Sequence, residues 1–170
     1  MTVTGDIRWV KVHYLDASAL VKLVADDDDE KDGRAALREF YNSHGHHYAT
    51  SYCIAEALSA FKLKWLRKKI TLGEYIKDVR EFFRLVLSHL TVDEVPLSVE
   101  ILDEADRLMK AHKIDFIDSI QLVTVLRGRF AHFAGESQSL FITADRKLAK
   151  AARKERVRVC DCTKEAPAPC

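Results

Sequence analysis

The stretch VKVHYLDASALVKLVA, residues 10–25, decides the fold class. Its first half, Val10–Leu15, is rich in β-branched and aromatic residues and predicts a short strand. Its second half, Ser18–Ala25, carries apolar residues at helical spacing and predicts a short helix. Asp16 stands between the two, directly after the predicted strand. A strand that passes at once into a helix is typical of α/β proteins.

The same alternation continues along the chain, where turn residues and capping patterns separate the elements. Further strands are predicted at His47–Thr50, Leu90–Val95, Leu140–Thr143 and Val157–Cys160. Further helices are predicted at Ala35–Tyr41, Ser51–Lys69, Thr71 to about Leu87, Ser98–Ala111, Phe116–Leu126 and Asp145–Arg153. This order predicts a parallel sheet covered by helices on both faces. We therefore expect one α/β domain, residues 1–165, followed by a loose C-terminal tail, residues 166–170.

Composition narrows the class of protein without naming a partner. The 170 residues are 48% hydrophobic and 31% charged, which is typical of an ordinary globular domain. The 27 basic and 26 acidic residues nearly cancel, so overall charge does not mark a nucleic-acid-binding protein. The chain has no apolar stretch long enough for a membrane span, no signal-peptide pattern at its start and no paired CxxC cysteines. A cytoplasmic protein without a membrane partner is the expectation.

Acidic side chains stand where the predicted strands end. Asp16 follows the first strand, and Asp145 follows the strand Leu140–Thr143. Glu56 lies in the first turns of the helix that follows the second strand. Because ligands of parallel α/β sheets bind at the carboxyl ends of the strands, we expect these three carboxylates to lie close together.

Two more acids open the helix Phe116–Leu126. Asp115 and Asp118 are spaced i, i+3, which places them on one face of that helix. Asp115 has two interpretations that the sequence leaves open, a helix N-cap or a further ligand. Asp118 stands among isoleucines inside the helix, where a carboxylate is costly to bury without a cation or a hydrogen-bond partner.

Carboxylates gathered at one edge repel one another and raise each other's pKa values. A hard divalent cation removes this cost, because carboxylate and water oxygens are the usual ligands of Mg²⁺ and Mn²⁺. Such ions activate a water molecule and stabilise the leaving oxygen of a phosphodiester. No His–Ser or His–Cys pairing and no glycine-rich phosphate loop competes with this site. The pattern therefore predicts metal-assisted phosphodiester hydrolysis and leaves the number of ions open.

Four motifs in order resemble those of PIN-domain ribonucleases, and of VapC-type toxins among them. The motifs are LDASALVK at 15–22, Thr50-Ser51 followed by Glu56, FIDSIQL at 116–122 and FITADRKL at 141–148. Each is weak alone, but their order and spacing fit from about residue 10 to residue 160. The helix after Asp118 departs from the family in having Gln121, Val123 and Thr124 where small alanines are common.

The resemblance implies a three-layer α/β/α sandwich with a short central parallel sheet. It also implies endoribonuclease activity that depends on Mg²⁺ or Mn²⁺, an RNA substrate, a homodimer and, for a toxin, a small antitoxin protein that neutralises it. The catalytic and metal-binding residues would be Asp16, Glu56, Asp118 and Asp145. Ser18 and Thr143 would be hydrogen-bonding neighbours of the metal site.

Two basic stretches offer contacts to RNA phosphates, although either is also compatible with a solvated helix face. One is residues 62–69, and the other, just beyond Asp145, includes Arg146, Lys147 and Lys150.

Other functions stay open beside the toxin. They are a housekeeping PIN nuclease in RNA processing and an inactive PIN domain that binds RNA or assembles with partners. A phosphatase of the haloacid-dehalogenase class, with Asp16 as nucleophile, is a further alternative. Such enzymes usually carry a second Asp two residues later, and here Ser18 stands at that position.

Overall fold

A single sheet of parallel strands forms the centre of the molecule. The structure, a computed structural model, describes residues 11–27, 29, 31–43, 46–136 and 138–167. The strands of this described part lie in the order β3-β2-β1-β4-β5. They are β1 Val12–Leu15, β2 His47–Ala49, β3 Leu90–Val92, β4 Ser139–Thr143 and β5 Val159–Asp161. The first predicted strand is thus the central one, paired with β2 on one side and β4 on the other.

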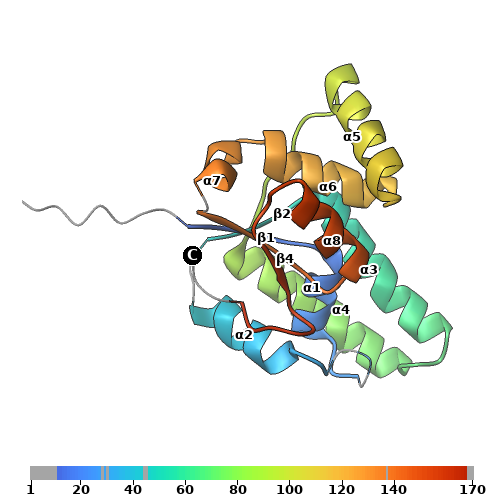
Figure 1. Ribbon diagram of the computed structural model, residues 1–170. Helices are drawn as coiled ribbons and strands as arrows, with labels where there is room; N and C mark the ends of the chain where they lie inside the picture. Colours follow the sequence, from blue (N-terminus) through green and yellow to red (C-terminus); the bar gives the residue numbers. More distant parts are fainter. Residues whose placement is uncertain (1–10, 28, 30, 44–45, 137, 168–170) are drawn as a thin grey trace, which may run out of the picture.

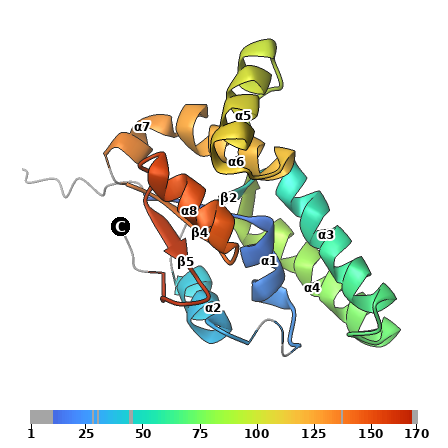
Figure 2. The same ribbon diagram turned by 45° about the vertical axis from the view of Figure 1, so that its right-hand side comes forward.

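Helices cover both faces of the sheet (Figures 1 and 2). They are α1 Ala17–Val24, α2 Arg34–Ser43, α3 Ser51–Leu66, α4 Leu72–His89, α5 Val99–His112, α6 Phe116–Arg127, α7 Ala131–Gly135 and α8 Arg146–Lys154. One core joins the sheet to α1–α4, and a second core joins it to α5, α6 and α8. The predicted three-layer α/β/α sandwich is confirmed. None of the helices in the described part of the chain is both long and apolar enough to cross a bilayer.

Alternation of side chains along β1 builds the two cores. Leu15 packs in the core of α1–α4, whereas Val12 and Tyr14 pack in the core of α5, α6 and α8. All three side chains are buried. Burial of both faces is typical of parallel sheets. In such proteins ligands bind at the carboxyl ends of the strands.

Some element boundaries differ from the sequence prediction. The third strand ends at Val92, and the carboxylate of the next residue, Asp93, accepts a hydrogen bond from the Tyr14 hydroxyl. The last strand runs from Val159 to Asp161, in register with the end of β4. Helix α7 was not predicted, and it has neither a side-chain cap nor a buried residue to mark it in the sequence. Val10, predicted as the first strand residue, lies outside the described residues.

The turn into α2 touches the C-terminal end of the described chain. Gly33 has a φ of +73°, and a Cβ atom there would stand 1.7 Å from the carbonyl oxygen of Cys162. Cys160 and Cys162 are buried free thiols beside this contact. Of the tail expected to be loose, Pro167 is buried, and residues 168–170 lie outside the described residues. Only glycine fits the approach of the turn to the segment after β5.

Candidate metal centre

Asp16 is the buried centre of the acidic cluster. It follows β1 and caps α1, where its carboxylate accepts a hydrogen bond from the backbone N–H of Ser18 at 3.3 Å. The same oxygen, Oδ2, accepts hydrogen bonds from the hydroxyls of Ser18 and Thr143, the latter at 2.7 Å. Burial raises the pKa of Asp16, and these hydroxyl donors act against the shift. Ser18 and Thr143 therefore both contact Asp16, and their role as neighbours of a metal site stays a prediction.

Two further acids cap helices that begin at the same edge. Asp145 caps α8, where its Oδ1 accepts from the N–H groups of Lys147 at 2.6 Å and Leu148 at 2.9 Å. Asp115 caps α6, where its Oδ1 accepts from the N–H of Asp118 at 2.9 Å. Asp115 therefore caps α6, as Asp16 and Asp145 cap their helices, and a further role as a ligand stays a prediction. The positive ends of α1, α6 and α8 partly offset the negative charge that collects here.

Glu56 and Asp118 approach the cluster from opposite faces of the sheet, on α3 and α6. Burial, and then the charge of Asp16, raises the pKa of Glu56 to about 7. The same two causes raise the pKa of Asp118 to about 8, with smaller contributions from Asp115 and other acids. The Oε2 atom of Glu56 is buried and has no hydrogen-bond partner among the described residues. All four predicted acids therefore belong to one electrostatic cluster.

The chemistry of this cluster fits a hard divalent cation. In the described part of the chain, no three His, Cys, Asp or Glu side chains stand close enough together to hold an ion as they lie. Carboxylates that share one edge of a sheet repel one another, and a bound cation removes that cost. An all-oxygen ligand set is the one that Mg²⁺ and Mn²⁺ prefer, and the Oε2 atom of Glu56, which has no hydrogen-bond partner among the described residues, is suited to bind a cation. The residues that would hold the ion are Asp16, Glu56, Asp118 and Asp145.

Gln121 contributes to the site in a way that the sequence prediction missed. Its side chain is buried, and its Nε2 donates to the carbonyl oxygen of Leu15 at 3.1 Å. This bond ties α6, one turn beyond Asp118, to the end of β1, one residue before Asp16. The sequence did contain a sign of it, because an amide inside an apolar helix needs a hydrogen-bond partner when buried.

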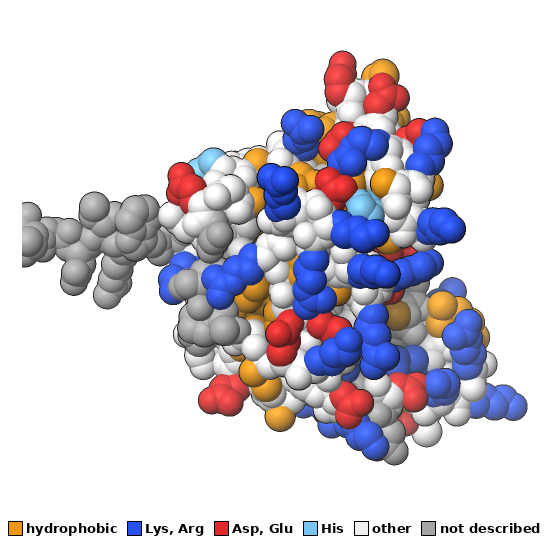
Figure 3. All heavy atoms as spheres, viewed as in Figure 1, with side chains coloured by type: hydrophobic (Ala, Val, Ile, Leu, Met, Phe, Trp, Pro, Cys, Tyr) orange, Lys and Arg blue, Asp and Glu red, His pale blue; other side chains and the backbone are white. Residues whose placement is uncertain are grey.

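The predicted RNA-contacting residues lie beside the cluster. Arg146, Lys147 and Lys150 are exposed on α8, directly after Asp145. Figure 3 shows Lys and Arg side chains gathered over the face of the molecule that carries α8. Their contact with RNA stays a prediction.

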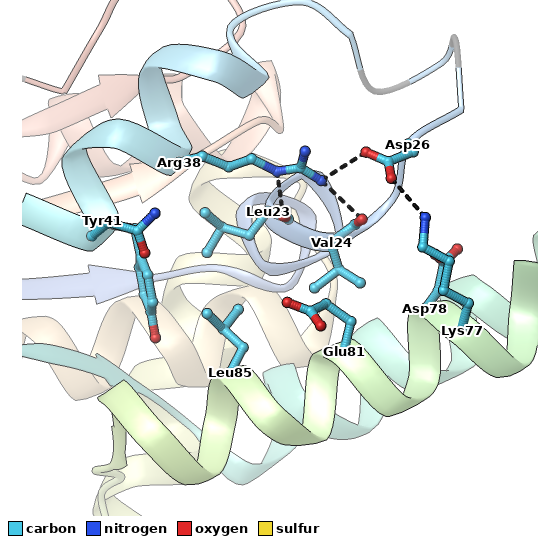
Figure 4. A pocket seen from close by; sticks show the side chains of 10 residues that line it. Leu23, Val24, Asp26, Arg38, Tyr41, Lys77, Asp78, Glu81 and Leu85 are labelled. Atoms are coloured by element: carbon cyan, nitrogen blue, oxygen red, sulfur yellow. Dashed lines mark hydrogen bonds and ion pairs between the residues drawn. The ribbon is translucent and has the colours of Figure 1, made fainter.

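A pocket of about 390 Å³ adjoins the cluster, and Ser18, Glu56 and Asp145 are among its lining residues. A separate cavity of about 350 Å³ lies between α1, α2 and α4 and contains none of the predicted site residues (Figure 4). In that second cavity the Arg38 guanidinium donates to the carbonyls of the last turn of α1 and to Asp26. The Arg38 contacts close the C-terminal end of α1, so they have a structural role.

Without metal, the stability of the protein is expected to rise as the pH falls from about 8 to about 4. The folded-state pKa values of Glu56 and Asp118, about 7 and about 8, lie above their ordinary values of 4.5 and 3.8. The folded chain then binds more protons than the unfolded chain, so stability is lost as the pH rises through this window. Because both groups are partly exposed and screened by solvent, we expect a change on the order of 2 kcal/mol.

Thermal unfolding in EDTA at a series of pH values measures this dependence. The Asp118→Asn variant, which cannot ionise, should show a flatter profile, and saturating Mg²⁺ should flatten the profile of the parent. Metal-free stability that increased from pH 5 to pH 8 would contradict the electrostatic description of the cluster.

The chain matches a known protein family in sequence and a solved structure in fold. The family model of the PIN domain matches residues 13–154, which is most of the chain. Among solved structures, the chain is similar to the crystal structure of PAE2754 from Pyrobaculum aerophilum, with a TM-score of 0.53. The two share 20% identity over 83% of this chain and 84% of that chain, which establishes a common fold only. No curated protein matches the chain.

Proposed function

Because the chain belongs to the PIN domain family, we propose that it is an endoribonuclease that depends on Mg²⁺ or Mn²⁺. PIN domains are generally nucleases, and the chain has their fold. The observation that carries the proposal is the convergence of Glu56 and Asp118, from two faces of the sheet, on the buried Asp16. A cluster of carboxylates with raised pKa values is the arrangement that a divalent cation stabilises.

Each side chain has a distinct task in this proposal. When bound, the metal would supply an activated water and positive charge for the leaving oxygen of the RNA phosphodiester. By donating hydrogen bonds to Oδ2, Ser18 and Thr143 favour the ionised form of Asp16 and oppose the effect of its burial. The Asp115 cap and the Gln121 tether fix the start of α6, and with it Asp118. These contacts pre-organise the carboxylates, which reduces the cost of assembling them around an ion.

We further propose that the nuclease is the toxin of a toxin–antitoxin pair, acts as a homodimer and is neutralised by a small antitoxin protein. The likeness of all four motifs to VapC-type toxins supports this role. The presence of every acid in one cluster favours an active enzyme over an inactive RNA-binding or assembly module. The match to the PIN family model also argues against a phosphatase of the haloacid-dehalogenase class. The Oδ2 atom of Asp16 is buried and accepts a hydrogen bond from Thr143, which suits a metal ligand better than a nucleophile.

Cleavage of total cellular RNA by the purified protein tests the activity. We expect discrete fragments with Mg²⁺ or Mn²⁺ and none with EDTA, because the carboxylates cannot activate water without an ion. Titration calorimetry with Mn²⁺ measures the metal site on the same sample. Metal binding without cleavage of any RNA would contradict the nuclease and favour the inactive module. Cleavage that persisted in EDTA would contradict the metal dependence.

A further inference from the structure

The cavity between α1, α2 and α4 has an apolar wall and an acidic one. Its volume of about 350 Å³ is within the size range of ordinary ligand sites. Leu23, Val24 and Leu85 supply apolar surface, and α4 supplies the carboxylates of Asp78 and Glu81. Figure 4 shows both acidic side chains on the side of α4 that faces α1. A cavity of this kind suits a ligand that carries a positive charge on an aliphatic stem.

Asp78 is a buried acid that the protein leaves unsatisfied. It lines the cavity, and only 4% of its surface is exposed. In the described part of the chain its carboxylate forms no hydrogen bond and no ion pair. Burial therefore raises the pKa of Asp78 to about 6, although the charge of the neighbouring Lys77 acts against the shift. A buried carboxylate without a partner is costly, so a cationic group that enters the cavity would remove this cost.

The basic side chains of the same wall are bound to another acid. Arg38 and Lys77 each form an ion pair with Asp26, at 3.0 Å in both cases. The Arg38 guanidinium also donates to carbonyl oxygens at the end of α1. These contacts hold both cations at the rim of the cavity, away from Asp78. The negative charge of Asp78 therefore stays available to a ligand.

Two other polar groups of the cavity have capacity for a donor. Glu81 stands three residues after Asp78, so the two carboxylates share one face of α4. Its Oε1 atom pairs with the exposed Arg84 at 2.7 Å, which leaves its second oxygen for a ligand. The buried hydroxyl of Tyr41 has no hydrogen-bond partner among the described residues. An ammonium group has three N–H donors and can satisfy several acceptors at once.

We propose that this cavity binds a primary alkylammonium group, with Asp78 and Glu81 as its carboxylate partners and the apolar wall around its aliphatic stem. Hydrogen bonds between an ammonium and a carboxylate are among the strong ones in proteins, because both partners are charged. The same chemistry has two sources, a free polyamine and a lysine side chain of a protein partner. The site is separate from the metal centre and does not depend on the nuclease function.

NMR titration of the isotope-labelled full chain with n-pentylammonium tests the site. Saturating Mg²⁺ keeps the amine away from the metal centre, and about 100 mM salt screens exposed charges. We expect chemical-shift changes at the residues of α1, α2 and α4 that line the cavity. The alcohol 1-pentanol, which has the same stem without the charge, should bind about tenfold more weakly or worse, because it lacks a charge-assisted hydrogen bond.

Asp78→Asn is expected to weaken amine binding by about tenfold or more. Its melting temperature should not fall, because the substitution removes a buried charge without a partner. Glu74→Gln is the matched control, since Glu74 is an exposed acid of α4 one turn before Asp78 and lies outside the cavity. Glutamine also keeps the capping box that Glu74 forms with Thr71, so this variant should bind the amine as the parent does. Glu81→Gln decides the question if Asp78→Asn fails to fold.

Two further probes distinguish the sources of the amine. Spermidine represents a free polyamine, and Nα-acetyl-lysine methylamide represents a lysine side chain. Tighter binding of spermidine that is lost in Asp78→Asn would support the site and assign it to a polyamine. Tighter binding of the lysine derivative, lost in the same variant, would support the site and assign it to a protein partner.

Three results would overturn the proposal. The first is a folded parent whose cavity signals do not move with any of the amines. The second is binding of 1-pentanol as tight as that of n-pentylammonium, which would make the cavity apolar only. The third is unchanged amine affinity in both Asp78→Asn and Glu81→Gln, which would place the bound amine elsewhere.

Discussion

Asp16→Asn is expected to lower metal-dependent RNA cleavage by about a thousandfold or more while the fold stays intact. Loss of the central carboxylate removes a metal ligand, and metal-based charge stabilisation is worth several kcal/mol, with each 1.36 kcal/mol a factor of ten in rate. Asparagine keeps the N-cap of α1, because its amide oxygen can accept the hydrogen bond from the backbone N–H of Ser18. The substitution also removes a buried charge, so metal-free stability should not fall.

Single-turnover cleavage of RNA by parent and variant, with melting temperatures for both, measures the effect. Asp103→Asn is a suitable control, because Asp103 is an exposed acid on α5, away from the cluster. It should cleave RNA at the rate of the parent. An Asp16→Asn protein that cut RNA as fast as the parent would show that the carboxylate cluster is not the catalytic centre.

Gly33→Ala is expected to lower the free energy of unfolding by about 3 kcal/mol, or roughly 6–12 °C in melting temperature. The alanine Cβ would meet the backbone carbonyl of Cys162 at 1.7 Å, and backbone cannot move aside as a flexible side chain can. The positive φ of +73° adds strain for any residue with a side chain.

The control for this prediction is Gly135→Ala, since a Cβ at Gly135 meets nothing within 4 Å. Gly135 is the last residue of the short helix α7, and its replacement should change stability by less than about 1 kcal/mol. Urea unfolding of both variants provides the comparison. Equal stabilities would mean that the turn into α2 does not approach the segment after β5 as closely as described.

The sequence predicted the fold because the decisive information is local. The strand Val12–Leu15 is followed by a helix directly after Asp16, and the same step from strand to helix recurs along the chain. The rule that ligands of parallel sheets bind at the carboxyl ends of the strands then predicted that Asp16, Glu56 and Asp145 lie close together. Order along the chain was sufficient for these inferences.

The remaining features depend on contacts between distant residues. The cap that Asp115 forms on α6 depends on the path of the backbone, and the Gln121 bond needs the position of β1 relative to α6. Lys22 sits in an ordinary helical pattern, and only packing of α1 against its neighbours makes it a buried cation in the wall of a pocket. Helix α7 buries no residue and therefore leaves no periodic pattern.

The hydrogen bond from Thr143 to Asp16 joins residues 127 positions apart. On the ribosome the N-terminal segments emerge first. Strand β1 can pair with β4 only after the helices and strands between them have been synthesised. Contacts of such long range also form slowly. A nascent chain that already carries Asp16, Glu56 and Asp118 therefore lacks the strand that completes their surroundings. The surroundings of the buried carboxylate therefore form only after β4 has been synthesised, later than the three strands that precede it in the chain.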